Sequence, residues 1–182
     1  MASVWDSVVG QSRAVEQLQH VAISPVHAYL LVGTEGCGKE EASRAFAAML
    51  MSGSDNPTER INELVMRGAH PDVHEVRREG ASILKEQADE VIRIASITPS
   101  EGTRKVIIMH EVHLMHATSA ARLLKTVEEP PSGVFFIMLA DQVDDSLATI
   151  ASRCLTVHFG LLENADIEQA LINSGIAPHL AN

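Results

Sequence analysis

The feature that most constrains the fold is an apolar segment that runs directly into a glycine-rich loop and then into a helical pattern. Residues 28–33, "AYLLVG", form a continuous apolar run, which is typical of a strand buried on both faces of a parallel sheet. The loop "GTEGCGKE" covers residues 33–40, and "EEASRAFAAMLM" after it carries apolar residues at helical spacing. A strand, a glycine loop and a helix in this order predict a phosphate-binding loop.

The loop departs from the phosphate-binding pattern at one position. The pattern G-x-x-x-x-G-K-[ST] is met by Gly33, Gly38 and Lys39, but Glu40 replaces the hydroxyl that binds magnesium. Amides around Gly36 and Gly38 would hold phosphates, and Lys39 would reach their oxygens. A carboxylate at this point repels them. We expect a degenerate site with at most weak affinity for ATP or ADP; the alternative is a glycine-rich turn retained for packing.

The second half of such a site is a strand that ends in an acid. Here the strand "KVIIM" (105–109) is followed by His110 and Glu111, where an aspartate would position the magnesium ion. A neutral imidazole is a poor ligand for a hard cation. Because two metal-binding positions have changed, we expect no ATP hydrolysis. The competing hypothesis is an active ATPase in which Glu40 and Glu111 hold magnesium in an unusual arrangement.

Apolar segments and helical patterns alternate along the rest of the chain. This alternation predicts an α/β fold of the P-loop type: a five-stranded parallel sheet with helices on both faces and right-handed crossovers. The expected strands are residues 28–33, 72–76, 105–109, 134–139 and 155–159, and helical patterns cover 82–96, 118–129 and 146–152.

Gly160 is the expected domain boundary. Residues 1–160 hold all the expected strands, and residues 161–182 carry one further helical pattern that ends at Gly175. A single amphipathic helix cannot bury its apolar face alone. We therefore expect residues 161–182 to be the start of a truncated helical lid domain, or to be covered by a partner.

Composition excludes several classes of function. The net charge of -10 argues against autonomous nucleic-acid binding. Cys37 and Cys154 form neither a disulfide framework nor a zinc-ligand set. With no basic segment before an apolar run, and no apolar run long enough to span a membrane, we expect a cytoplasmic chain with no membrane partner.

Two groups of residues suggest a metal site and a DNA-contact patch, but their positions in the sequence favour neither. His110, His113 and His116 recur every three residues, but one closes a strand and the others follow it, so they need not converge on a metal. We expect no metal site. The adjacent basic pairs are interpreted as solvated faces rather than as a DNA-contact patch: Arg77 with Arg78, and Arg104 with Lys105.

Several segments together closely resemble the N-terminal AAA+ module of bacterial DNA polymerase III clamp-loader subunits, over about residues 4–160. The most specific are "LLKTVEEPP" and the triplet "SRC", joined by "GTEGCGK", "HPDVHEV" and "KVIIMHEVHLM". The degenerate loop resembles that of delta prime subunits rather than that of gamma/tau. The segment "VVGQSRAVEQL" resembles the entry segment of the family, which implies that Val8, Val9 and Gly10 lie near an adenine.

The resemblance also implies a role for Arg153. By position alone, Arg153 at a helix end complements the helix dipole. In the family, the arginine of "SRC" enters the ATP site of a neighbouring subunit as a trans-acting finger. The implied partners are gamma/tau and delta, and through them the sliding clamp and primed DNA. An AAA+-like adaptor outside replication is a further alternative.

The sequence departs from the family pattern at two more points. Residues 51–69 contain no cysteine where the family usually has a four-cysteine zinc module, so no zinc is expected. Ala140 and Asp141 stand at the sensor position, where threonine or asparagine is common. This change further weakens the case for γ-phosphate sensing.

Overall fold

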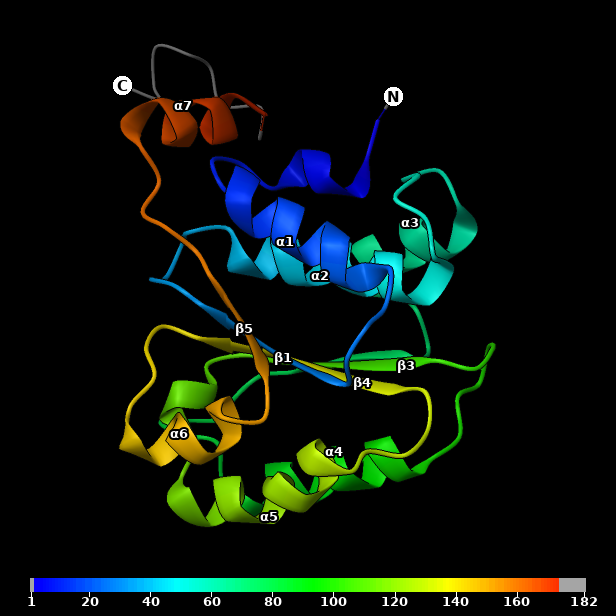
Figure 1. Cartoon of the computed structure of the whole chain (residues 1–182), viewed down its shortest axis with the longest axis vertical. Coiled ribbons are helices and arrows are strands. Elements are labelled where there is room, and N and C mark those ends of the chain that lie inside the picture. Colours follow the sequence, from blue (N-terminus) through cyan, green and yellow to red (C-terminus); the bar gives the residue numbers. More distant parts are fainter. Residues whose placement is uncertain (1, 174–182) are drawn as a thin grey trace.

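The computed structural model describes residues 2–173, which form a three-layered α/β domain (Figure 1). All five strands are parallel, in the order β2-β3-β4-β1-β5. The strands are β1 (Ala28–Val32), β2 (Val73–Val76), β3 (Lys105–Met109), β4 (Val134–Ala140) and β5 (Leu155–His158). The predicted fold class is confirmed, and each strand lies within one residue of its predicted bounds at either end.

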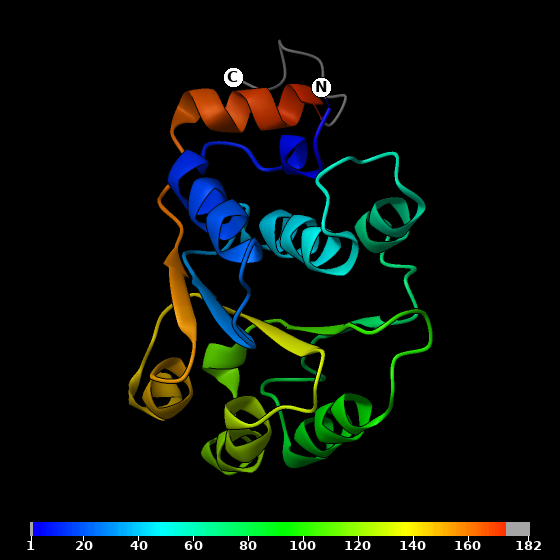
Figure 2. The same cartoon turned by 45° about the vertical axis from the view of Figure 1, so that its right-hand side comes forward.

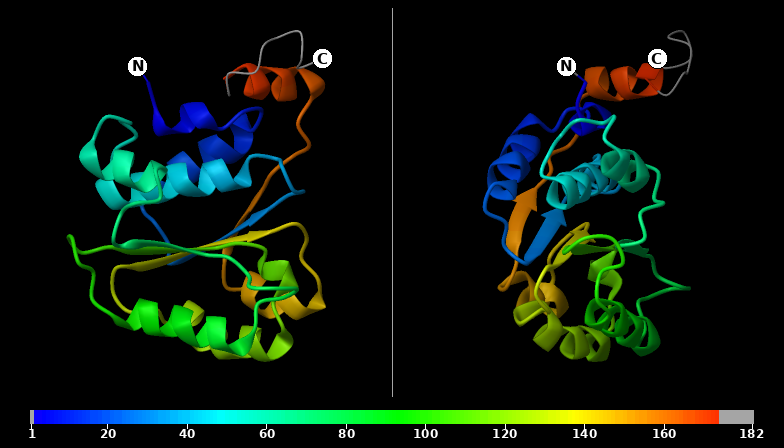
Figure 3. Two further views of the ribbon diagram at one scale, coloured as in Figure 1. Left: turned by 180° about the vertical axis from the view of Figure 1, so that it is seen from behind. Right: turned by 90° about the vertical axis from the view of Figure 1, so that its right-hand side faces the viewer.

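Helices cover both faces of the sheet, as Figure 2 shows. They are η1 (Val4–Ser7), α1 (Ser12–Ala22), α2 (Lys39–Ser52), α3 (Arg60–Met66), α4 (Lys85–Ser96), η2 (Val112–Leu114), α5 (Ala117–Glu128), α6 (Asp145–Ala151) and α7 (Asn164–Asn173). Helices α1, α2 and α3 lie on one face, and α4, α5 and α6 on the other (Figure 3). Each face has its own core of buried, mainly aliphatic side chains.

The sequence pattern predicts neither α1 nor α3. Helix α1 buries only Ala14 and Leu18 completely, so its apolar stripe is narrow. Helix α3 has 7 residues within a polar segment and buries Asn62 and Val65. Both helices therefore depend on packing against α2 rather than on strong periodicity of their own.

The parallel sheet sorts the connecting loops onto two edges. The carboxyl ends of β1, β2, β3 and β4 meet at one edge, which is where ligands bind in open α/β sheets. The glycine loop follows β1 at this edge. The segment before β5 lies at the opposite edge, because Leu155 pairs with Tyr29 near the start of β1.

Helix α7 agrees with the helical pattern predicted after Gly160, up to the last described residue; its predicted end at Gly175 lies outside the described residues. It sits beyond α1 and η1, away from the sheet (Figure 1). The assignment of residues 161–182 to a lid domain stays a prediction. No helix in residues 2–173 is long and apolar enough to cross a membrane.

Candidate functional site

A cavity of about 400 Å³ opens at the carboxyl edge of the sheet, beside the glycine loop. Residues from four parallel strand ends and from the start of α2 surround it. Its lining consists of Glu35, Gly36, Gly38, Lys39, Glu40, Glu41, Arg77, His110, Glu111, Leu139 and Asp141. The structure thus brings together five of the predicted nucleotide-site residues: Gly36, Gly38, Lys39, Glu40 and Glu111.

The loop has the backbone of a phosphate cradle. Gly36 and Gly38 have φ angles of 76° and 89°, a region that glycine enters without steric cost. Helix α2 begins at Lys39, directly after Gly38, so its N-terminal amides face the cavity side of the loop. This part of the P-loop prediction agrees with the structure.

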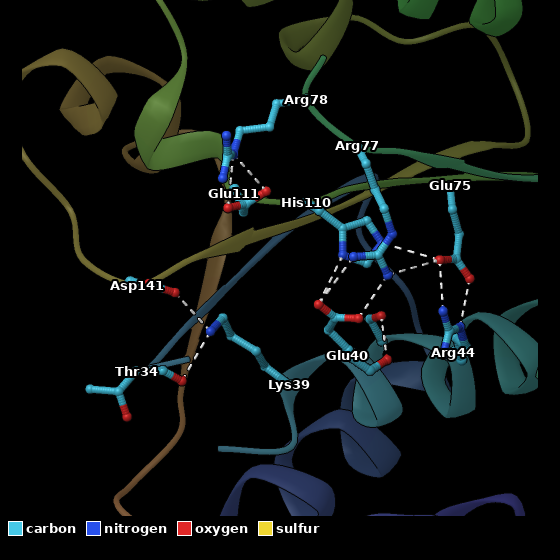
Figure 4. Close-up of polar contacts among 11 residues, drawn as sticks. Thr34, Lys39, Glu40, Arg44, Glu75, Arg77, Arg78, His110, Glu111 and Asp141 are labelled. Carbon is cyan, nitrogen blue, oxygen red and sulfur yellow. Dashed lines mark hydrogen bonds and ion pairs between the residues drawn. The ribbon is translucent and has the colours of Figure 1, made fainter. Parts of the chain in front are cut away.

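The lysine of the loop is already paired. Lys39 is 7% exposed, and its Nζ donates hydrogen bonds to the Thr34 carbonyl at 3.0 Å and to Asp141 Oδ1 at 2.8 Å (Figure 4). Asp141 follows β4, at the position expected for a γ-phosphate sensor. It therefore neutralises the charge that a phosphate would need.

The residue in place of the magnesium-binding hydroxyl is paired as well. Both oxygens of Glu40 accept hydrogen bonds from the Arg77 guanidinium, at 2.7 and 3.3 Å (Figure 4). The bidentate contact with Arg77 lowers the pKa of Glu40 below its usual value. Arg77 follows β2, so a fixed guanidinium meets the carboxylate where the family pattern has a metal-binding group.

Behind this pair lies a second, more buried one. The guanidinium of Arg44, on α2, donates to both oxygens of Glu75 on β2, at 2.6 and 2.9 Å. His110 Nε2 lies 3.2 Å from Glu75 Oε2, and its Nδ1 lies 3.6 Å from Glu40 Oε1. The histidine in the position of the catalytic-site aspartate thus packs between two carboxylates of the chain itself (Figure 4).

Glu111 is paired with another arginine. Both of its carboxylate oxygens lie 3.0 Å from Arg78 Nε. Glu111 has a φ of 53° and is the one non-glycine residue with positive φ in the described part of the chain, an uncommon conformation that packing must hold. Its carboxylate lies at the cavity but is occupied by Arg78.

The residues present do not fit a magnesium nucleotide. The cavity lining carries five carboxylates, those of Glu35, Glu40, Glu41, Glu111 and Asp141, against two cationic side chains. Both cations are paired with carboxylates. A triphosphate would meet repulsion at close range and would have to break these pairs. Residues 2–173 contain no cluster of three or more His, Cys, Asp or Glu placed to share a metal ion.

The ion-pair network predicts a specific dependence of stability on pH. His110 and Arg44 lower the pKa of Glu75 far below 4.5. Glu75 therefore stabilises the fold above its unfolded-state pKa, and this stabilisation is lost as the pH falls below about 4.5. We expect Glu75→Gln to destabilise the protein at pH 7 by about 1.5–3 kcal/mol, the range for hydrogen bonds to charged groups.

Urea unfolding between pH 7 and pH 3 measures this effect. The stability gap between wild type and Glu75→Gln should narrow as the pH falls below 4.5. Glu101→Gln, which removes an exposed pair with Arg60, is the matched control and should show a smaller gap at pH 7. A gap for Glu75→Gln that is constant with pH would contradict the assignment.

Four predicted residues do not line the cavity. Gly33 is a packing position, because a Cβ there would lie 2.7 Å from Phe159 Cβ and 2.8 Å from Cys37 Sγ. Val8, Val9 and Gly10 lie in the entry segment between η1 and α1, and none of them contributes to the lining. Their proximity to an adenine stays a prediction.

A neighbouring residue, Gln11, links the entry segment to two other parts of the chain. It is 6% exposed. Its Nε2 donates to the Cys37 carbonyl at 3.0 Å and to the Gly160 carbonyl at 2.8 Å, and its Oε1 accepts from Gly160 N at 3.1 Å. Gln11 thus joins the glycine loop to the predicted domain boundary. The only sign of this role in the sequence is that a polar residue follows the apolar and glycine residues 8–10.

Arg153 lies at the edge of the sheet opposite the glycine loop, between α6 and β5. Its side chain is 33% exposed. The guanidinium contacts Glu128 Oε1 through Nε and donates from Nη1 to the Thr149 carbonyl at 2.7 Å. Arg153 therefore lies outside the cavity of its own chain, and its role as a trans-acting finger stays a prediction.

Treating the basic pairs as solvated faces was wrong for Lys105 and incomplete for the arginines. Lys105 is 3% exposed, and its Nζ donates to the Ile94 and Ile97 carbonyls at the end of α4. Arg104 stacks over the Phe135 ring at 5.7 Å. Arg77 and Arg78 were missed as site residues, although they follow β2, whose carboxyl end must lie at the same edge as the glycine loop.

The three histidines do not converge. His110 contacts Glu75, Nδ1 of His113 accepts from Asp141 N at 3.2 Å, and His116 Nδ1 lies 2.9 Å from Thr118 Oγ1. Both cysteines are free thiols.

Comparison with known proteins places these features in a family. A model described as DNA polymerase III, delta subunit, matches residues 10–163. The chain belongs to this family. The match includes the degenerate loop, the ion-pair network and Arg153. The family assignment agrees with the resemblance found in the motifs.

Individual DNA polymerase III subunits are similar to this chain over most of its length. A protein named DNA polymerase III subunit delta', from Bacillus subtilis, is 35% identical over 159 residues, covering 85% of this chain and 48% of that protein. A tau subunit of the same organism is 32% identical over 165 residues, covering 85% and 29%. The chain spans less than half the length of these two relatives.

Solved structures share the fold. A gamma subunit-related protein of Thermotoga maritima superposes with a TM-score of 0.63 at 20% identity, covering 86% of this chain and 49% of that one. A RuvB variant from the same organism gives a TM-score of 0.65 at 14% identity, covering 95% of this chain and 55% of that one. At these identities the likeness concerns the fold alone.

Proposed function

We propose that this chain is a delta prime-like subunit module of a bacterial clamp loader in DNA replication. It is a non-hydrolysing AAA+ module that contributes Arg153 to the ATP site of a neighbouring subunit. The observation that carries the proposal is the pairing of Lys39 with Asp141 and of Glu40 with Arg77. The groups that would bind phosphate and metal are thus engaged with each other.

The features at the two opposite edges of the sheet support separate parts of the proposal. At the carboxyl edge, the frame of a P-loop is retained but its charges are neutralised internally. At the amino edge, Arg153 lies outside the cavity and its side chain is partly exposed. A subunit of this kind can lack an ATPase of its own and still be needed for the ATPase of its neighbour.

The proposed partners are the gamma/tau and delta subunits, with the sliding clamp and primed DNA reached through the assembled complex. Similarity to proteins named delta', gamma and tau supports the subunit partners. The net charge of -10 supports contact with DNA through partners rather than through this chain.

Calorimetric titration of ATP, with and without magnesium, tests the proposal on the purified chain. We expect no magnesium-dependent binding and no turnover, and Lys39→Ala should give the same result as wild type. Glu41→Ala, which removes a lining carboxylate outside the pairs, serves as the control for general loss of charge. Magnesium-dependent binding that disappears in Lys39→Ala would favour the rival reading, an active ATPase.

A further inference from the structure

The two most specific sequence motifs meet in space through one ion pair. Glu128 lies in "LLKTVEEPP" at the end of α5, and Arg153 lies in "SRC" after α6. The carboxylate of Glu128 contacts Nε of Arg153. Helices α5 and α6 are neighbours on the same face of the sheet (Figure 2). Nothing in the nucleotide-site chemistry of this chain uses the pair, since it lies at the opposite edge.

We propose that Glu128 is a positioning residue, which holds the Arg153 guanidinium in the orientation that a neighbouring subunit's ATP site receives. The proposal rests on the trans role of Arg153 proposed above. Glu128 itself touches no reacting group.

The contacts of Arg153 fix one side of the guanidinium and leave the other available. Nε is held by Glu128, and Nη1 donates to the Thr149 carbonyl at 2.7 Å and to Ser152 Oγ at 3.1 Å. Nη2 donates to no group within residues 2–173. A guanidinium offers five N–H donors in a planar fork, so the end that carries Nη2 stays free for an incoming phosphate oxygen.

Of the three groups that hold the guanidinium, Glu128 is the only charged one. A charge-assisted hydrogen bond is stronger than a neutral one. Without it, Arg153 would be held only by a carbonyl and a hydroxyl from its own turn. A free arginine side chain samples many rotamers, and restraining it before assembly removes part of this entropic cost from the encounter with phosphate.

The pair is poorly placed to serve stability. The side chains of Arg153 and Glu128 are 33% and 40% exposed, and solvent-exposed ion pairs contribute little to stability. A role in positioning can therefore be separated from a role in folding, because removing Glu128 should leave the fold intact.

The experiment measures ATPase kinetics of the reconstituted clamp loader, with this chain as wild type, Glu128→Ala, Arg153→Ala or the double variant. We expect Glu128→Ala to lower turnover at the one site that receives Arg153 about 3- to 10-fold, with KM for ATP little changed, because only the transition-state contact is affected. Glu128→Gln should lose less, since its amide oxygen still accepts from Nε. The double variant should match Arg153→Ala.

Asp89→Ala is the matched control, because Asp89 forms a similar exposed ion pair with Arg122 of α5. It should leave kcat unchanged, and thermal unfolding should show all variants folded. If Arg153→Ala lowers kcat while Glu128→Ala behaves like Asp89→Ala, the positioning role is wrong and the proposed function stands. If Arg153→Ala itself has no effect, both fall. A Glu128→Ala loss that adds to that of Arg153→Ala would also overturn the positioning role.

Discussion

Replacing Arg153 by alanine should abolish ATP turnover at the one site that receives this arginine, while this chain stays folded. Arginine fingers accelerate phosphoryl transfer by about 10³–10⁵-fold, so that site should become silent on the timescale of loader turnover. Steady-state ATPase of the reconstituted complex should then fall by the share that this site contributes, measured with clamp and primed DNA present.

Arg153→Lys is the informative companion variant. Lysine keeps the positive charge but lacks the planar fork that holds Glu128 and Thr149 while presenting Nη2. We expect little rescue of turnover. Full activity of Arg153→Ala in an intact complex would rule out the finger, and a failure of the complex to assemble, seen by gel filtration, would assign Arg153 to the interface instead.

Replacing Gly133 by alanine should strongly destabilise the fold. Gly133 has a φ of 79°, and a Cβ there would lie 2.1 Å from the Thr103 carbonyl oxygen. The Gly133 carbonyl also accepts from Lys105 N at 2.9 Å, at the start of β3. Because the added Cβ would meet main-chain atoms of Thr103, the clash cannot be relieved by rotating a side chain. We expect a loss of at least about 3 kcal/mol in unfolding free energy.

Gly53→Ala separates the backbone strain from the clash. Gly53 has a φ of 75°, close to that of Gly133, but no heavy atom lies within 4 Å of its added Cβ. Its cost should therefore be the left-handed conformation alone, about 1–2 kcal/mol. Urea unfolding of both variants gives the comparison. Equal losses would show that the close approach at Gly133 relaxes.

The fold was largely predictable because its signals are local. Each of the five strands is a short apolar run, and the helical patterns after β1, β2 and β3 are long enough to be recognised from spacing. Helices α1 and α3 were not, because few of their side chains reach the core. These two helices are stabilised by packing against α2, and a short stretch of sequence does not reveal such a contact.

The candidate site was predictable only in part, and the division has a physical cause. Motif spacing identified Lys39 and Glu40, because the loop that holds them is continuous in sequence. It missed Arg77 as the partner of Glu40, since the two are separated by 37 positions and meet only when β2 lies in the sheet. Charge pairing across strands is a tertiary property.

By itself, the sequence determined the five strands, the glycine loop and the helices that follow β1, β2 and β3, together with the loss of the magnesium-binding hydroxyl and the family motifs around Arg153. Apolar periodicity and glycine placement act over a few residues, so they can be recognised from the local sequence. Only the tertiary structure decided that Lys39 is neutralised by Asp141, that Arg153 faces away from its own cavity, and that Glu128 holds it. These facts depend on which strand ends share an edge of the sheet.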